Sequence, residues 1–204
     1  MSNSYPPKHH QEYNSELIQQ VALQYPFATL VSANSDEPYI THAPLILENN
    51  KLIGHIDASN PHVSLLKNNN KAVAIFNGPQ SYISPSVYTT KQLPTWNYLI
   101  AHGYGLVTAI TDPLAIKKSL VTMTEYMEGT TPKFVLDLED PRMDRLVPYI
   151  HCFELNIQRW EGKFKISQDK SIQDIDNAKQ QLIKSNQASI KDFIDSLFAA
   201  HFSH

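Results

Sequence analysis

The sequence predicts a mainly β protein, in which an antiparallel sheet closes into a small barrel with helices packed outside it. Strand-like segments follow one another, with short turn-rich segments between them, over residues 27–76 and again from Trp96. Strands and helices do not alternate, and neither a G-x-G-x-x-G sequence nor a Walker loop occurs. A doubly wound nucleotide-binding fold is therefore not expected.

Length and composition indicate one ordinary globular domain, which we expect to span residues 1–204. No apolar run approaches the roughly 18 residues of a membrane span, so we expect no membrane partner. The single cysteine, Cys152, lies in the apolar stretch YIHCFEL, which predicts a buried, inert thiol and a cytoplasmic protein. A net charge of −3 gives no overall attraction for nucleic acid, so charge does not support DNA as a partner.

The first half of the chain predicts one helix followed by strands. Asn14 or Ser15 caps the helix, apolar residues recur at helical spacing, and Pro26 ends it. Four strands follow as FATLVSAN, PYITHAPLILE, KLIGHID and KAVAIFN, with a short helix at NPHVSLLKNNN before the last. WNYLIAHGYGLVTAI then reads as one long strand, in which Gly103 and Gly105 allow a bend or bulge.

The second half contains the clearer helices. Asp112 caps a helix that Gly129 ends, and IHCFELNIQRW reads as a further strand. Two C-terminal helices are predicted from about Ser171. The second carries an apolar stripe formed by Ile190, Phe193, Ile194, Leu197 and Phe198.

Two segments carry side chains suited to an anion. In EGKFKISQD, a strand would place Glu161, Lys163, Lys165 and Ser167 on one face, where two ammonium groups and a hydroxyl suit a phosphate. The alternative is an edge strand whose lysines prevent aggregation. In GHIDASNPH, residues 54–62, the amides at a helix start can receive an anion, or the side chains only cap the helix.

Other site chemistries find less support. The histidines show neither an H-x-x-x-H nor an H-E-x-x-H spacing, so no metal site is predicted. His55 and His102 can equally be buried residues or ligand contacts. No G-x-S-x-G elbow indicates a serine hydrolase, and no side chain identifies itself as a catalytic base.

The stretch GPQSYISPSVYTTKQLPTWNY, residues 78–98, combines prolines, aromatic rings and hydroxyls without a clean helical or strand period. Prolines restrict the backbone, and the rings supply flat surfaces with a polar end. We expect a stiff loop that walls a binding site for a planar ligand, plugs one end of the barrel or forms a subunit contact.

Together these segments resemble one known family. ITHAPLIL, LIGHIDASNP, IFNGPQSYISPSVY, LPTWNY, HGYG and EGKFKISQ occur in the order seen in the PaiB-like FMN-binding negative transcriptional regulators. The similarity extends from the first helix to about residue 185. It implies an FMN-binding split barrel, related to pyridoxamine-phosphate oxidases and flavin reductases, with FMN at a homodimer interface.

The resemblance also implies which residues bind the cofactor. By position they are His55, Ser59, Asn60, Thr95, Trp96, Asn97, Lys163, Lys165 and Ser167. The chain departs from the family pattern at Val87, where a tryptophan is usual, and at Asp57, Ser59 and Asp169. Loss of positive charge beside a phosphate is expected to weaken FMN binding, because each charged hydrogen bond contributes about 1.5–3 kcal/mol.

Three functions follow as hypotheses. The first is an FMN-binding homodimer that acts in negative transcriptional regulation, although no helix-turn-helix is recognised. The second is a flavin-dependent oxidoreductase or flavin reductase, in which the flavin supplies the chemistry. The third is a split barrel without cofactor that serves as an interaction module.

Overall fold

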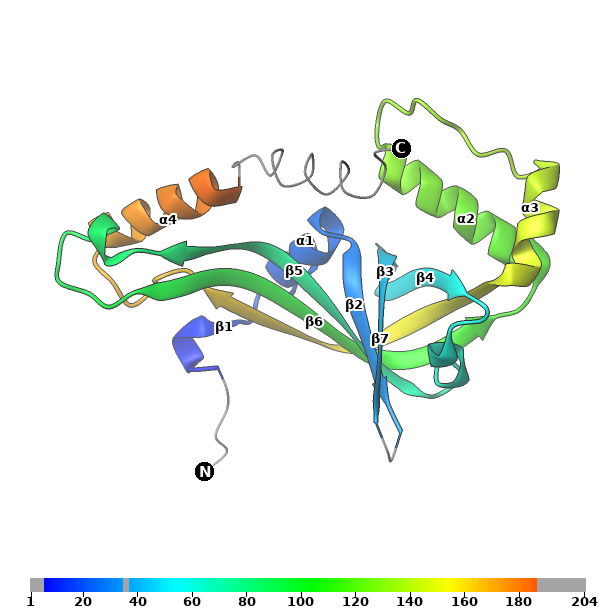
Figure 1. Cartoon of the computed structure of the whole chain (residues 1–204), viewed down its shortest axis with the longest axis horizontal. Coiled ribbons are helices and arrows are strands. Elements are labelled where there is room, and N and C mark those ends of the chain that lie inside the picture. Colours follow the sequence, from blue (N-terminus) through cyan, green and yellow to red (C-terminus); the bar gives the residue numbers. More distant parts are fainter. Residues whose placement is uncertain (1–5, 35–36, 187–204) are drawn as a thin grey trace, which may run out of the picture.

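Within the part of the chain that the structure describes, seven antiparallel strands form one sheet that closes on itself. A computed structural model of the chain describes residues 6–34 and 37–186. The strands are β1 Gln11–Glu12, β2 Phe27–Ala33, β3 Pro38–Glu48, β4 Lys51–Asp57, β5 Lys71–Ile83, β6 Thr95–Ile110 and β7 Ile150–Lys165. Their order is β1-β7-β4-β3-β2-β5-β6, and β6 also pairs with β7 (Figure 1). This closure confirms the predicted antiparallel barrel.

In the view of Figure 1 the labelled α-helices lie along the upper side of the sheet. Within the described residues they are α1 Ser15–Gln24, α2 Pro113–Glu128, α3 Pro141–Leu146 and α4 Ile172–Asn186. Short 3-10 helices span Lys8–His10, Pro61–Ser64, Pro85–Val87 and Val147–Tyr149. The predicted helix at residues 190–198 lies outside the described part of the chain. None of the described helices has the length and apolar character to cross a membrane.

The predicted helix boundaries follow from capping. The Asn14 side chain accepts hydrogen bonds from the amides at the start of α1, and Asp112 accepts one from the Ala115 amide at the start of α2. Gly129 ends α2 with a φ of 71°, a left-handed value that favours glycine. The short α3 was not predicted, because one and a half turns carry too few residues for a helical period.

The main core fills the barrel, and a smaller core lies outside it. Leu30, Phe76, Phe153 and Leu155 are fully buried inside. The smaller core joins α2 and α3 to the sheet through Ile116, Leu120, Met143 and Cys152. Cys152 is 1% exposed, and burial raises the pKa of its thiol, which confirms the predicted buried cysteine.

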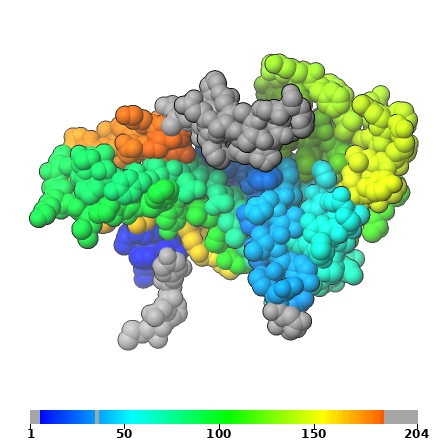
Figure 2. All heavy atoms as spheres, viewed as in Figure 1, coloured from blue at the N-terminus to red at the C-terminus, as the bar shows by residue number. Residues whose placement is uncertain are grey.

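The stretch 78–98 is mostly a β-hairpin, which corrects the expected loop. Ile83 of β5 pairs with Thr95 of β6, so only residues 84–94 form the connection. The register shifts between Asn77 and Gln80, and this irregularity accommodates Pro79 within a strand and hides the alternation in the sequence. The hairpin forms one end of the molecule, and α2 and α3 form the other (Figures 1 and 2).

Strand β7 continues through the predicted phosphate segment as far as Lys165. Gly162 and Phe164 are buried, while Glu161, Lys163 and Lys165 are partly exposed, as the alternation predicts. Ser167 was wrongly placed on the lysine face. It lies beyond the strand with a φ of 65° and is 3% exposed, because the chain turns there toward α4.

Candidate functional site

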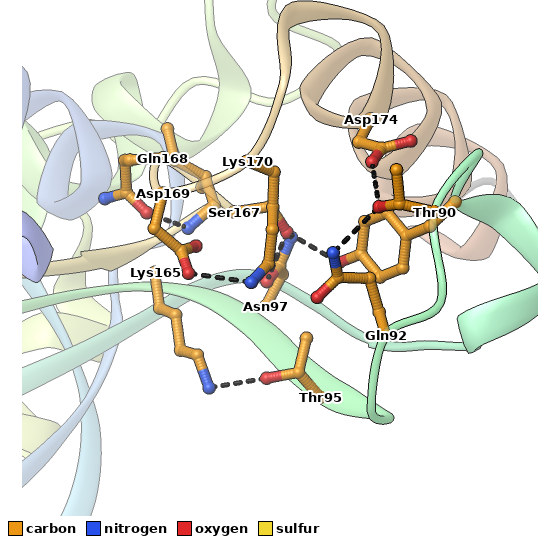
Figure 3. A network of polar contacts seen from close by, with 12 residues as sticks. Thr90, Gln92, Thr95, Asn97, Lys165, Ser167, Gln168, Asp169, Lys170 and Asp174 are labelled. Atoms are coloured by element: carbon orange, nitrogen blue, oxygen red, sulfur yellow. Dashed lines mark hydrogen bonds and ion pairs between the residues drawn. The ribbon is translucent and has the colours of Figure 1, made fainter.

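A polar cavity of about 350 Å³ lies where the hairpin meets the end of β7 (Figure 3). Its lining combines cations, hydroxyls and a proline-bearing loop. The residues are His10, Tyr88, Gln92, Leu93, Pro94, Thr95, Lys165, Ser167, Asp169 and Lys170. Of the nine predicted cofactor residues, Thr95, Lys165 and Ser167 line this cavity.

Ser167 is the centre of a buried hydrogen-bond network beside the cavity. Its hydroxyl lies 2.9 Å from the Tyr88 hydroxyl and accepts a hydrogen bond from the Asn97 amide at 3.0 Å. Asn97 is 1% exposed, so it supports the cavity wall. Asn97, which is one of the nine predicted residues, therefore positions Ser167 and does not itself line the cavity.

The cavity carries positive charge. The ammonium group of Lys165 donates to the Thr95 hydroxyl at 2.5 Å, and Lys170 forms an ion pair with Asp169 at 2.8 Å. Burial, followed by the charges of His9 and Lys165, lowers the pKa of His10, which favours its neutral form. The two lysines against one carboxylate leave a net positive charge that suits an anionic group.

The loop of the hairpin is held over the cavity by α4. Asp174, near the start of this helix, accepts hydrogen bonds from the Thr89 amide at 2.6 Å, the Thr89 hydroxyl at 2.8 Å and the Thr90 hydroxyl at 3.1 Å (Figure 3). The Thr89 amide above all holds the pKa of the Asp174 carboxyl below its usual value. The loop therefore has a fixed position over the cavity.

A second polar group occupies the outer face of β6 and β7. Glu161 accepts a hydrogen bond from the Tyr104 hydroxyl at 2.9 Å and pairs with Arg159 at 3.1 Å and Lys163 at 3.5 Å. The Arg159 guanidinium stacks over the Tyr104 ring at 3.8 Å. Burial and the charge of Lys163 lower the pKa of His102, which is therefore largely neutral near pH 7. The predicted residue Lys163 belongs to this group.

Trp96 lies on the hairpin, with half of its side chain exposed. Its indole N–H donates to the Gln80 side chain on the neighbouring strand at 3.2 Å. Trp96 pairs with Tyr82, which is also half exposed, so the two aromatic residues are direct cross-strand neighbours. This predicted residue offers a flat surface to a ligand or subunit.

Ser59 and Asn60 lie at the opposite end of the barrel, in the turn after β4. The Ser59 amide and hydroxyl donate to Asp57 at 2.7 and 2.6 Å, and they hold the pKa of that carboxyl below its usual value. Asn60 accepts from the His62 amide at 2.9 Å and donates to the Thr41 hydroxyl at 3.3 Å. The Asp57 carboxylate makes this turn unfavourable for a phosphate.

His55 occupies a fourth position, on β4 beneath α2 and α3. It pairs with Cys152 on β7 and lines an apolar cavity formed with these helices. Burial lowers the pKa of its imidazole, which is therefore neutral near pH 7. The described structure does not bring His55 together with the cavity at Lys165.

The nine predicted residues therefore do not form one site within a single chain. Asp57, beside Ser59, pairs with Ile150 at the first residue of β7, and Lys165 is the last residue. With about 3.3 Å of rise per residue, the 16 residues of β7 span roughly 50 Å. One FMN molecule is much shorter than this distance.

Tyr88, Lys170 and Asp174 were missed by the sequence interpretation. Tyr88 could have been proposed as a site residue, because it lies in the stretch 78–98, which combines aromatic and hydroxyl side chains. Nothing in the sequence joins Asp174 to Thr89, since this contact spans 85 residues.

Residues 4–159 match the sequence profile of a family described as "Putative FMN-binding domain". The chain belongs to this family. The assignment confirms FMN as the predicted cofactor, and it agrees with the resemblance found in the sequence motifs. One relative is "Protease synthase and sporulation protein PAI 2" of Bacillus subtilis, which is 25% identical over 87% of this chain and 88% of its own. The uncharacterized protein YKL070W of Saccharomyces cerevisiae is 30% identical over 52% of this chain and 72% of its own.

Solved structures confirm the split-barrel fold of this FMN-binding family member. The FAD and heme binding protein from Mycobacterium smegmatis has a TM-score of 0.63 and 16% identity, over 82% of this chain and 79% of the other. The flavocytochrome Anf3 from Azotobacter vinelandii has a TM-score of 0.59 and 13% identity, over 81% of this chain and 74% of the other. At these identities the similarity shows the fold alone.

Proposed function

We propose that the protein is a cytoplasmic homodimer that binds FMN in two sites, each built from both subunits. This proposal rests on the distance along β7 that separates the two groups of predicted residues. The Asn60 turn follows Asp57, which pairs with the first residue of β7, whereas Lys165 is the last residue of β7, so the turn and the Lys165 cavity lie at opposite ends of this strand. A twofold axis near the middle of β7 would exchange the two ends, so that the turn of one subunit approaches the cavity of its partner.

The charges at the Lys165 cavity and at the Ser59 turn indicate which part of FMN each would contact in the proposed dimer. The cavity with Lys165 and Lys170 receives the phosphate, because its positive charge and hydroxyl donors suit a dianion. Trp96 and Tyr82 offer flat surfaces to the isoalloxazine ring. The turn at Ser59 and Asn60 of the other subunit contributes polar contacts away from the phosphate, where Asp57 is tolerated.

Mixing two binding-deficient variants tests the shared site. Lys165→Met removes the charge, whereas Asn60→Asp keeps the oxygen that caps the following turn and adds a carboxylate. Each variant alone should bind FMN weakly in a fluorescence titration. After subunit exchange, heterodimers should contain one intact site each, so about a quarter of the wild-type sites should return.

Failure of the mixture to recover FMN binding, in the presence of demonstrated heterodimers, would place the site within one subunit. Size-exclusion chromatography of the separate variants controls for assembly. A wild-type protein that binds no FMN would contradict the flavin assignment itself and favour the interaction module without cofactor.

For the biological role, we propose negative regulation of transcription that depends on flavin occupancy. The family resemblance supports this role, and the net charge of −3 predicts weak, salt-sensitive contact with DNA. Gel shifts with flavin-loaded and flavin-free protein at two salt concentrations test it. Tight binding that resists salt would contradict the expected weak contact.

The alternative is a flavin-dependent oxidoreductase. Its support is the fold shared with a FAD and heme binding protein and a flavocytochrome, whose names indicate redox cofactors. FMN would supply the electron-transfer chemistry, while the protein residues bind and orient it. Anaerobic addition of a reduced nicotinamide should then bleach the flavin absorption, and an unchanged spectrum would exclude nicotinamide as the donor.

A further inference from the structure

One wall of the Lys165 cavity comes from the N-terminal segment of the chain. His10, the last residue of the 3-10 helix Lys8–His10, lines the cavity from this side. Strand β1 follows directly and pairs with β7 close to Lys165, so the segment runs along the end of β7. His10 therefore shares the cavity with the ammonium groups of Lys165 and Lys170.

Hydrogen bonds on both sides of His10 fix the path of this segment. The His10 amide donates to the Pro7 carbonyl at 2.8 Å. After β1, the Glu12 carboxylate accepts hydrogen bonds from the amides of Tyr13 and Asn14 at 2.8 and 2.7 Å, where the chain turns into α1. His10 therefore has a defined place in the cavity wall.

The imidazole of His10 is able to bind a ligand. Within the described residues neither of its ring nitrogens takes part in a hydrogen bond, and the ring contacts the His9 ring edge to face, with 4.1 Å between the centroids. A protonated imidazole carries two N–H donors, which suit the oxygens of a phosphate. His10 can thus add a charged donor to those of Lys165 and Lys170.

The charges around His10 favour a neutral ring when no anion is bound. Burial, and then the charges of His9 on the same segment and Lys165 at the end of β7, lower the pKa of the imidazole. Asp169 acts in the opposite direction, and Lys170 and the Tyr88 hydroxyl complete the titratable groups of the cavity. The ring is therefore mostly neutral near pH 7.

A phosphate dianion in the cavity would reverse this preference. Opposite charge within about 4–6 Å favours the protonated form of an imidazole. Asp169 does not compete for the proton, because the hydrogen bond from Lys170 above all holds the pKa of its carboxyl below its usual value. Of the lining residues, His10 is thus the one that titrates nearest to pH 7.

We propose that His10 is a phosphate-binding residue of the flavin site, and that it binds as the imidazolium, so that the protein takes up a proton as FMN binds. This inference rests on the proposed binding of FMN at the Lys165 cavity and adds a residue and a pH dependence to that site. By linkage, FMN binding should strengthen as pH falls from 8 toward the lowered pKa of free His10. The gain ends near pH 6, where a phosphate monoester becomes a monoanion.

Calorimetric titration of the full-length protein with FMN tests the proton uptake. Two buffers of pH 7 that differ in ionisation enthalpy report the number of protons, and we expect a large part of one proton per FMN. Binding should be about fivefold tighter at pH 6.5 than at pH 8. Riboflavin, which lacks the phosphate, should cause no proton uptake.

Two matched substitutions identify the group that takes up the proton. His10→Gln keeps a hydrogen-bonding side chain that cannot be protonated, so it should abolish the uptake and weaken FMN binding about fivefold at pH 6.5 but less than about twofold at pH 8. His9→Gln makes the same change one residue away, outside the cavity lining, and should keep the uptake. Loss of the uptake in His9→Gln alone would overturn the assignment to His10.

Proton NMR of the histidine ring C–H groups gives an independent readout. The His10 signal, identified by its absence from the His10→Gln spectrum, should titrate at a higher pH with FMN than without it. FMN binding with no such shift and no proton uptake would overturn the role of His10 and leave the flavin site standing. A wild-type protein that binds no FMN would overturn both this role and the proposed function.

Discussion

Gly105 lies at the bulge where the pairing of β6 with β7 shifts register. A Cβ atom at this position would lie 2.4 Å from the Asn156 carbonyl oxygen, which belongs to the backbone and cannot easily move. At Gly103 the nearest atoms, 3.0 Å or more away, belong to the side chains of Ile157 and Trp160. The two glycines predicted to allow a bend therefore differ in how strictly they are required.

We predict that Gly105→Ala lowers the free energy of unfolding by about 1–3 kcal/mol, as expected for overpacking. Gly103→Ala should cost less, because the neighbouring side chains can adjust. Urea unfolding of both variants measures the difference. Equal losses would show that the backbone at Asn156 relaxes readily.

Ser167 combines a left-handed backbone with a buried hydroxyl. Ser167→Ala leaves the groups of Tyr88 and Asn97 without this partner, so it should lower the free energy of unfolding by about 1–3 kcal/mol. Ser167→Gly loses the same hydroxyl but relieves the backbone strain, and it should be less destabilising. Thermal unfolding compares them, and a glycine variant less stable than the alanine variant would contradict this account.

Among the elements, α4 is attached to the hairpin loop through Asp174 and through Asn177, whose side-chain amide donates to the Val87 carbonyl at 2.8 Å. The pKa of the Asp174 carboxyl is lowered in the folded protein, so its contribution to stability is present in full above pH about 4. The contribution is lost as pH falls through the lowered pKa, because protonation then weakens the bonds from Thr89 and Thr90.

We therefore predict that the hairpin loop becomes more sensitive to an acid-active protease as pH falls below about 4, the ordinary pKa of an aspartate. Asp174→Asn should be more sensitive than the wild type at neutral pH and should show a smaller change on acidification. Cleavage within residues 84–94 is the measurement. Parallel pH profiles for the two proteins would indicate that another carboxylate controls the loop.

The predictable elements are those with local signals. Asn14 and Asp112 fix helix starts through contacts within a few residues, so the sequence indicates them directly. The hairpin was mistaken for a loop because the irregularity after Asn77 interrupts the alternation. The site was predicted only in part, since the Asp174–Thr89 contact and the separation of Asn60 from Lys165 depend on the pairing of distant strands.

At the scale of the whole molecule, one sheet face is suited to a subunit interface. Across β3, β2, β5, β6 and β7, this outer face carries a paired row of Ile40, Val31, Val73, Tyr104 and Arg159. Ile40 is 59% exposed in the single chain. Burial of this partly apolar row would contribute to the proposed homodimer.

We predict that Ile40→Glu dissociates the dimer at concentrations where the wild type is dimeric, with little change in the fold. Ile172→Glu, at an 88% exposed residue outside this row, should leave the dimer intact. Sedimentation velocity measures both. A dimeric Ile40→Glu protein would place the interface elsewhere.

Among the described strands β7 comes last in the sequence, and it pairs with β1, β4 and β6, so that its pairing with β6 closes the sheet into a barrel. During synthesis the first six strands leave the ribosome before it, so both edges that await β7 remain open. Such unpaired edges are prone to association with other chains. A chaperone or slow translation over residues 111–149 would therefore matter more to the yield of this protein than to its final stability.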